Sequence, residues 1–163
     1  MHRSSRAVLL LASTVAAGCS FFRGIGLAPG EQDHAAVKAV PANDEAAHVV
    51  VQHVLIAFEG SRISGATRTK DEARALALRV LEDAKSGRDF DELVRLYTDD
   101  RSPDGRVALA NWGVVPEANE SERRKMVRGF GATAFRLAVG EVGLLEYDAN
   151  ASPFGWHVVK RLK

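Results

Sequence analysis

The sequence predicts an α+β domain with a small, mostly antiparallel sheet of four strands and about four helices. Strand-like segments open and close this domain, at residues 48–58 (HVVVQHVLIAF) and 154–162 (FGWHVVKRL). Between them, apolar residues recur at helical spacing, at 69–97 and again at 126–140. A domain that begins and ends on strands, with helices in between, favours this fold class.

The first strand-like segment is apolar on both of its faces. In residues 48–58, the odd-numbered and the even-numbered side chains are both mainly aliphatic. This pattern is typical of a strand at the centre of a sheet. His53 interrupts the aliphatic run, and His157 interrupts the last strand in the same way. We therefore expect the two imidazoles to be neighbours in the sheet.

Two helices follow, and each begins with a capping pattern. Thr69 precedes Glu72 by three residues, the spacing of a capping box, and Gly87 ends the first helix. Asp89 and Glu92 repeat the pattern at the start of the second helix. The loop TDDRSPDG ends the pair at residues 98–105.

The second half of the domain consists of short elements. We expect a strand at 106–112 (RVALANW), a polar insertion with room for a helical turn at 113–125, and a short helix at 126–140. Strands at 141–147 and 154–162 follow, separated by a turn around DANAS.

The N-terminus reads as a leader and a tether. A basic stretch (MHRSSR) and an apolar run of 11 residues, too short to span a bilayer as a helix, end at Cys19. This pattern resembles a bacterial lipoprotein signal, which implies cleavage after residue 18 and acylation of Cys19. Residues 19–46 then form the lipidated cysteine and a flexible tether, and 47–163 form the domain. A plain secretory signal, or a buried free thiol, is the alternative.

Such a signal implies the cell envelope, with the protein held by its lipid on the extracytoplasmic or periplasmic face of a membrane. Ser20 follows the cysteine, where Asp favours inner-membrane retention, so by analogy the outer membrane is open as well. Charge argues against nucleic acid as a partner, because the formal net charge is +1 with both signs interspersed. No motif for a metal or a nucleotide is present, so we expect no cofactor.

Six motifs, in order, resemble the parvulin-type peptidyl-prolyl cis–trans isomerase domain. They are QHVLI, TKDEA, GRDFDEL, YTDD, FGATAFRLAVGEV and FGWHVVK. The resemblance spans residues 48–163 and implies a parvulin-like fold. It also implies an enzyme that isomerises X–Pro bonds without covalent chemistry and assists the folding of exported, proline-containing polypeptides. The alternative is a chaperone-like module that binds unfolded polypeptides without turnover.

The resemblance also assigns roles to polar residues. His53 and His157 match the family's two facing histidines. Asp100, in YTDD, matches the position that is Cys or Asp near the prolyl bond, and Thr98 is a weaker candidate for supporting this network. Neutral imidazoles each have one donor and one acceptor, so the two rings can satisfy one another inside an apolar sheet.

Leu109, Met126 and Phe130 match the family's apolar trio that holds the proline ring. The sequence departs from the family nearby: GRVALANW replaces the usual glycine-rich GGDLG turn, and the segment 112–126 is longer than usual, as is LLEYDANASP. These departures keep the binding-module alternative open.

Two further alternatives concern other ligands. His53, His157 and Asp100 would be the ligands if the domain bound a metal. Basic residues in the loop after the first strand would favour an acidic or phosphorylated residue before proline; they are Arg62, Arg68 and Lys70.

Overall fold

The computed structural model describes residues 45–102 and 104–163. Nearly all of the predicted leader and tether, including Cys19, lies outside these residues. Within the described part of the chain, no helix is long and apolar enough to cross a membrane.

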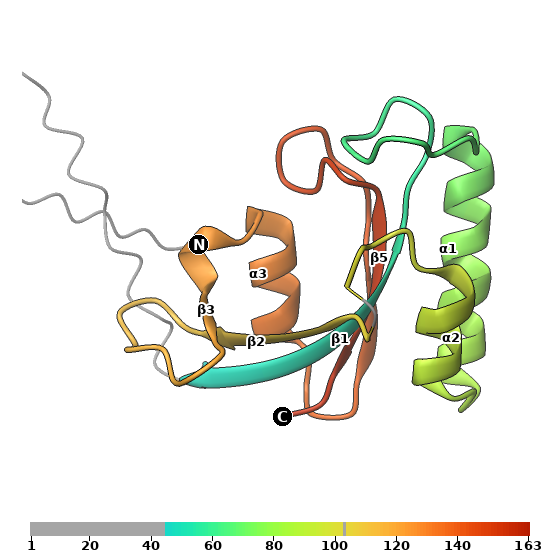
Figure 1. Ribbon diagram of the computed structural model, residues 1–163. Helices are drawn as coiled ribbons and strands as arrows, with labels where there is room; N and C mark the ends of the chain where they lie inside the picture. Colours follow the sequence, from blue (N-terminus) through green and yellow to red (C-terminus); the bar gives the residue numbers. More distant parts are fainter. Residues whose placement is uncertain (1–44, 103) are drawn as a thin grey trace, which may run out of the picture. The chain divides into compact units, whose positions relative to one another are not determined.

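The described residues form an α+β domain with a five-stranded mixed sheet (Figure 1). Its strand order is β3-β2-β1-β5-β4, and every pairing is antiparallel except β2 with β3. The strands are β1 (His48–Ile56), β2 (Arg106–Ala110), β3 (Ser121–Glu122), β4 (Val142–Leu145) and β5 (Trp156–Arg161). The helices are α1 (Lys70–Lys85), α2 (Phe90–Tyr97) and α3 (Arg128–Arg136), with one 3₁₀ turn, η1 (Arg123–Lys125).

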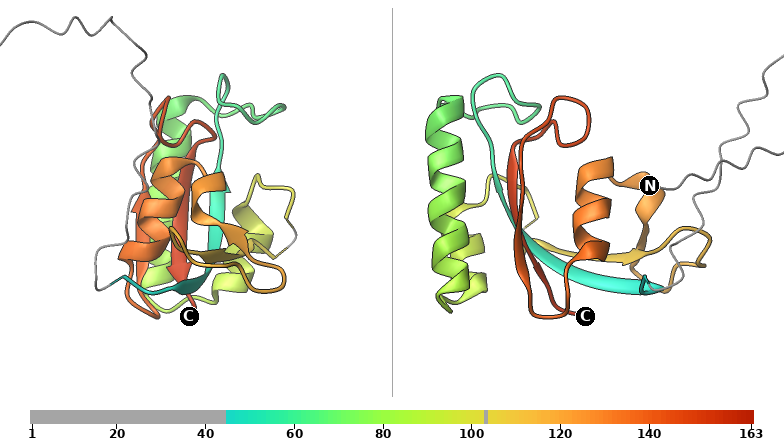
Figure 2. Two further views of the ribbon diagram at one scale, coloured as in Figure 1. Left: turned by 90° about the vertical axis from the view of Figure 1, so that its left-hand side faces the viewer. Right: turned by 180° about the vertical axis from the view of Figure 1, so that it is seen from behind.

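Helices cover both faces of the sheet. Figures 1 and 2 show α1 and α2 on one side of β1 and β5, and α3 on the other side. Val54 and Ile56 of β1 pack with α1 and α2, whereas Val49 and Val51 pack with α3. The prediction of a central first strand is confirmed, because β1 lies between β2 and β5 and needs apolar side chains on both faces.

The predicted helix starts are also confirmed. The Thr69 hydroxyl accepts from the Glu72 amide at 3.2 Å, and the Glu72 carboxylate accepts from the Thr69 amide at 2.8 Å. The Asp89 side chain caps α2 by accepting from the Asp91 amide. Glu92 does not complete a box there, because its carboxylate pairs with Arg88 at 3.0 Å.

Two counts in the predicted fold are wrong. The described residues contain five strands rather than four, and three α-helices rather than about four. Ser121 and Glu122, inside the expected polar insertion, pair in parallel with Leu109 and Ala110. A two-residue edge strand with polar side chains has no apolar alternation to reveal it. The helical turn expected in the same insertion is the 3₁₀ turn η1.

Gly105 joins the loop 98–105 to β2 and positions β1. Its φ is +61°, and its carbonyl accepts from the His53 amide at 2.9 Å. A Cβ on Gly105 would lie 2.4 Å from the His53 carbonyl oxygen. This glycine therefore permits the approach of the loop to the strand that carries the first histidine.

Gly105→Ala should lower the free energy of unfolding more than Gly60→Ala does. Gly60 has φ +92° but open space around it, so alanine there should cost only the left-handed conformation, about 1–2 kcal/mol. At position 105 the contact with the backbone should add about 1–3 kcal/mol. Urea denaturation of the two variants measures the difference, and equal losses would contradict the close approach.

Candidate active site

The two histidines lie on adjacent central strands. In the antiparallel register of β1 and β5, His53 is opposite Val159 and His157 is opposite Leu55. The rings are therefore diagonal neighbours on the face that α3 covers, with centroids 5.3 Å apart and an interplanar angle of 23°. The structure thus brings together the two imidazoles that the sequence predicts to be neighbours.

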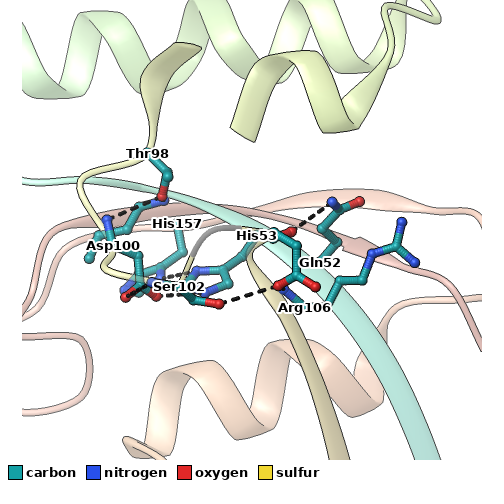
Figure 3. Close-up of polar contacts among 9 residues, drawn as sticks. Gln52, His53, Thr98, Asp100, Ser102, Arg106 and His157 are labelled. Carbon is teal, nitrogen blue, oxygen red and sulfur yellow. Dashed lines mark hydrogen bonds and ion pairs between the residues drawn. The ribbon is translucent and has the colours of Figure 1, made fainter. Parts of the chain in front are cut away.

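A polar chain links both rings to Asp100 (Figure 3). The Nδ1 atoms of His53 and His157 are 3.2 Å apart, and His53 Nε2 lies 3.0 Å from Asp100 Oδ2. Both histidines are only 4% exposed, whereas about a third of the Asp100 side chain is exposed. The chain therefore leads from the interior of the sheet to a carboxylate at the surface.

Phe130 of α3 packs against both histidine rings of this hydrogen-bonded chain. Its ring meets His53 edge-on at 5.1 Å and His157 at 5.5 Å. The side chain is 5% exposed. Packing against an aromatic ring holds the imidazoles in place and excludes water from the buried end of the chain.

The surroundings of Asp100 and His157 determine whether each of these groups is charged. The hydrogen bond from His53 lowers the pKa of Asp100 from 3.8 to about 2, so this group is a carboxylate at neutral pH. Burial lowers the pKa of His157 from 6.5 to about 3, so this ring is neutral. When both rings are neutral, His53 donates from Nε2 to Asp100, and its Nδ1 accepts from Nδ1–H of His157.

This assignment leaves one buried acceptor, His157 Nε2. It has no hydrogen-bond partner among the described residues. A buried polar atom without a partner loses its hydration without compensation, commonly by about 1–3 kcal/mol. Such a loss in the middle of a sheet is tolerated where the group serves another purpose, here orienting the neighbouring ring.

The segment that carries Asp100 is held against β1. The Thr98 hydroxyl accepts from the amides of Leu55 and Asp100, both at 3.2 Å. Asp99 was missed in the sequence, although it lies in the same YTDD motif. Its amide donates to the Leu55 carbonyl, and its carboxylate accepts from the Ala57 amide at 2.8 Å. Thr98 and Asp99 together fix where the Asp100 carboxylate lies.

The predicted apolar trio lies in one cluster with α3 and β2, but its members differ in access. Leu109 is fully buried and Phe130 nearly so, while Met126 is partly exposed. Met126 lines an open pocket of about 370 Å³. Trp112, which the sequence did not single out, lines the same pocket.

Two of the three cations of the basic loop contact other side chains of the domain. Arg68 Nη1 lies 2.6 Å from the Asp99 carboxylate, and the Lys70 ammonium lies 4.7 Å from the centre of the Tyr147 ring. Of the three cations proposed to meet an acidic substrate, Arg68 alone forms an ion pair among the described residues, while Lys70 contacts aromatic rings and Arg62 has neither kind of contact there. One of the three charges is therefore neutralised by a carboxylate within the domain.

The metal alternative has no support in the described part of the chain. No group of three or more His, Cys, Asp or Glu side chains there is arranged to hold an ion.

Comparisons with known proteins agree with this fold. The family model described as PPIC-type PPIASE domain matches residues 35–163. A crystal structure of a PpiC-type peptidyl-prolyl cis-trans isomerase domain, at 1.55 Å resolution, has a TM-score of 0.50 to this chain. It is 13% identical in sequence, and the likeness covers 71% of this chain and 89% of that one. None of the curated proteins compared with the chain matches it.

Stability should fall as the pH falls, because of His157. The unfolded chain binds a proton at this residue below about pH 6.5, whereas the folded chain does so only near pH 3. The unfolded state therefore holds the extra proton in this window, which lowers the free energy of unfolding by up to about 1.4 kcal/mol per pH unit. Asp100 acts in the same direction between pH 3.8 and about 2.

Denaturant titrations of wild type and His157→Asn from pH 7 to pH 4 measure this slope. The variant should be less dependent on pH by up to one proton, while Asp100→Asn should keep the wild-type slope in this range. Parallel profiles for wild type and His157→Asn would contradict a buried, neutral ring.

Proposed function

Since the chain belongs to the family of PpiC-type peptidyl-prolyl isomerase domains, we propose that it catalyses the cis–trans isomerisation of X–Pro bonds in polypeptides. The observation that supports activity is the chain from His157 through His53 to the partly exposed Asp100 carboxylate. It places a negative charge, held in one orientation, at the surface of the domain.

The reaction requires rotation about a bond with partial double-bond character. Its barrier is about 18–20 kcal/mol and reflects lost amide resonance, so no covalent step is needed. Resonance places negative charge on the carbonyl oxygen in the planar forms and less in the twisted form. A carboxylate near that oxygen repels the planar forms more than the twisted one, which lowers the barrier.

The roles of the other residues follow from this charge. His53 donates to Asp100 and keeps the carboxylate ionised, since the hydrogen bond lowers its pKa. Neutral His157 orients His53 from within the sheet without adding a second charge. Met126, with its flexible thioether, supplies apolar surface for the proline ring.

The burial of Leu109 favours a second candidate, a binding module without turnover. Leu109 exposes no surface and Phe130 only 5%, so two members of the expected apolar trio lie beneath the surface. A domain that holds unfolded segments on a shallow apolar surface would need no deeper proline pocket.

Asp100→Asn should lower kcat/KM about tenfold to hundredfold in a protease-coupled assay with an Ala-Pro tetrapeptide. The estimate is the Coulomb energy of one charge at about 4 Å, roughly 1–4 kcal/mol for a partly exposed site. Asp104→Asn is the matched control, since this exposed carboxylate lies in the same loop and does not contact the histidines.

A wild-type rate equal to the uncatalysed rate would rule out the isomerase. If unfolded polypeptides still bound under those conditions, the binding module would be the function instead.

We further propose that the protein acts on exported polypeptides in the cell envelope, held there by acyl chains on Cys19. Support comes from the N-terminal sequence alone, with its basic start, short apolar run and cysteine. An acyl chain contributes about 0.8 kcal/mol of membrane affinity for each buried CH₂, so two or more chains give stable anchoring.

Cys19→Ala should abolish incorporation of labelled palmitate and move the protein from the membrane to the soluble fraction. Ser20→Ala, one residue further on, should leave both unchanged. Palmitate labelling that persists in Cys19→Ala would overturn the assignment of the lipid to this residue.

A further inference from the structure

The pocket beside Met126 is rich in arginine. It has a volume of about 370 Å³ and lies between Trp112, η1 and the start of α3. No carboxylate is among the described residues that line it. The lining includes Trp112, Met126, Gly131, Arg123, Arg124 and Arg128.

The three arginines differ in their exposure and in the ion pairs that they form within the domain. Arg123 is 12% exposed and pairs with Glu45 at 2.6 Å, so it belongs to the wall of the pocket. Arg124 pairs with Glu122, which also binds Lys125 at 2.8 Å, so one carboxylate there faces two cations. Arg128 is exposed and has no ion pair or hydrogen bond within the described part of the chain.

The remaining charge around the pocket is therefore positive. Two carboxylates, Glu45 and Glu122, are in ion pairs with three cations. Arg128 forms no ion pair among the described residues but lies near enough to Asp148 for their opposite charges to interact, so four cations stand against three carboxylates. A site lined by one sign of charge attracts ligands of the other sign. The ring of Trp112 suits the methylene groups of an acidic side chain, whose carboxylate would reach the guanidinium of Arg128 or Arg124.

The pocket adjoins the candidate active site along one short segment. Met126 packs against the apolar cluster that contains Phe130, and Phe130 contacts both histidines. Gly131, the next residue, lines the pocket, and a Cβ there would lie 3.1 Å from the Arg123 side chain. A polypeptide bound with its proline against Met126 would thus place a neighbouring side chain at the arginines.

We propose that this pocket selects polypeptides with an acidic residue within about three positions of the proline. Three positions of extended chain span roughly 10 Å. The proposal rests on the isomerase function and specifies its substrate class. It assigns the charge preference to the loop after β2, η1 and α3, and not to the basic loop after β1, where Arg68 is already paired with Asp99.

The test compares heptapeptides with a central proline that differ only in charge. Glu, Gln or Lys is placed in turn at each of the three positions before and the three positions after the proline. Turnover is measured by the coupled assay, and binding by the fluorescence of the protein, with Trp112 at the pocket. Wild type should favour Glu over Gln about two- to fivefold at one of these positions, as expected of one exposed ion pair. The preference should shrink in 0.5 M salt.

Arg128→Gln should bring the ratio of kcat/KM for Glu and Gln peptides close to one. Arg136→Gln is the matched control: it is an exposed arginine on the same helix that does not line the pocket. Equal rates for Glu and Gln peptides in wild type, with normal turnover, would overturn the acidic preference and leave the isomerase standing.

Absence of turnover with every peptide would instead contradict the proposed function. In that case binding decides the inference: tighter binding of Glu peptides, lost in Arg128→Gln and kept in Arg136→Gln, supports the acidic pocket. Binding that is independent of peptide charge rejects it.

Discussion

The structure depends on the need to give hydrogen-bond partners to two imidazoles that are buried inside an apolar sheet. β1 and β5 are the central strands, and both of their faces are covered by helices, so water does not hydrate the rings. Each ring must find its partner within the protein, since a buried polar group without one is destabilising. His53 and His157 meet through Nδ1, which fixes the register of β1 against β5 as well as the orientation of both rings.

The same requirement for hydrogen-bond partners positions a charged carboxylate at the surface. Once His157 occupies Nδ1 of His53, the remaining nitrogen of His53 points to Asp100, which becomes the accepting end of the chain. The low pKa of Asp100 and the low pKa of His157 are two results of one arrangement, since the first group gains a donor and the second loses its hydration. The result is one ionised carboxylate at the surface, held in place by two buried rings.

The second feature of the site is the pocket beside Met126, which η1 and α3 form together. α3 packs on the sheet through apolar side chains, whereas η1 is held by Arg123, which bonds to Glu45 and to Asn111 Oδ1 and stacks its guanidinium on Phe135 of α3 at 4.5 Å. These contacts hold the polar segment 113–125 against the end of β2. The same arginine lines the pocket beside Met126, so these bonds also fix one wall of that pocket.

Much of the fold and part of the site were determined by the sequence alone. Apolar periodicity and capping residues are local signals, so the central strand, both helix starts and the strand–helix order were predictable. The pairing of His53 with His157 was predictable from two imidazoles in apolar strands together with the family motifs. The edge strand Ser121–Glu122, the hold of Asp99 on β1, the burial of Leu109 and the arginine-lined pocket were decided by tertiary structure. Each depends on which distant segments meet, and no local pattern records that.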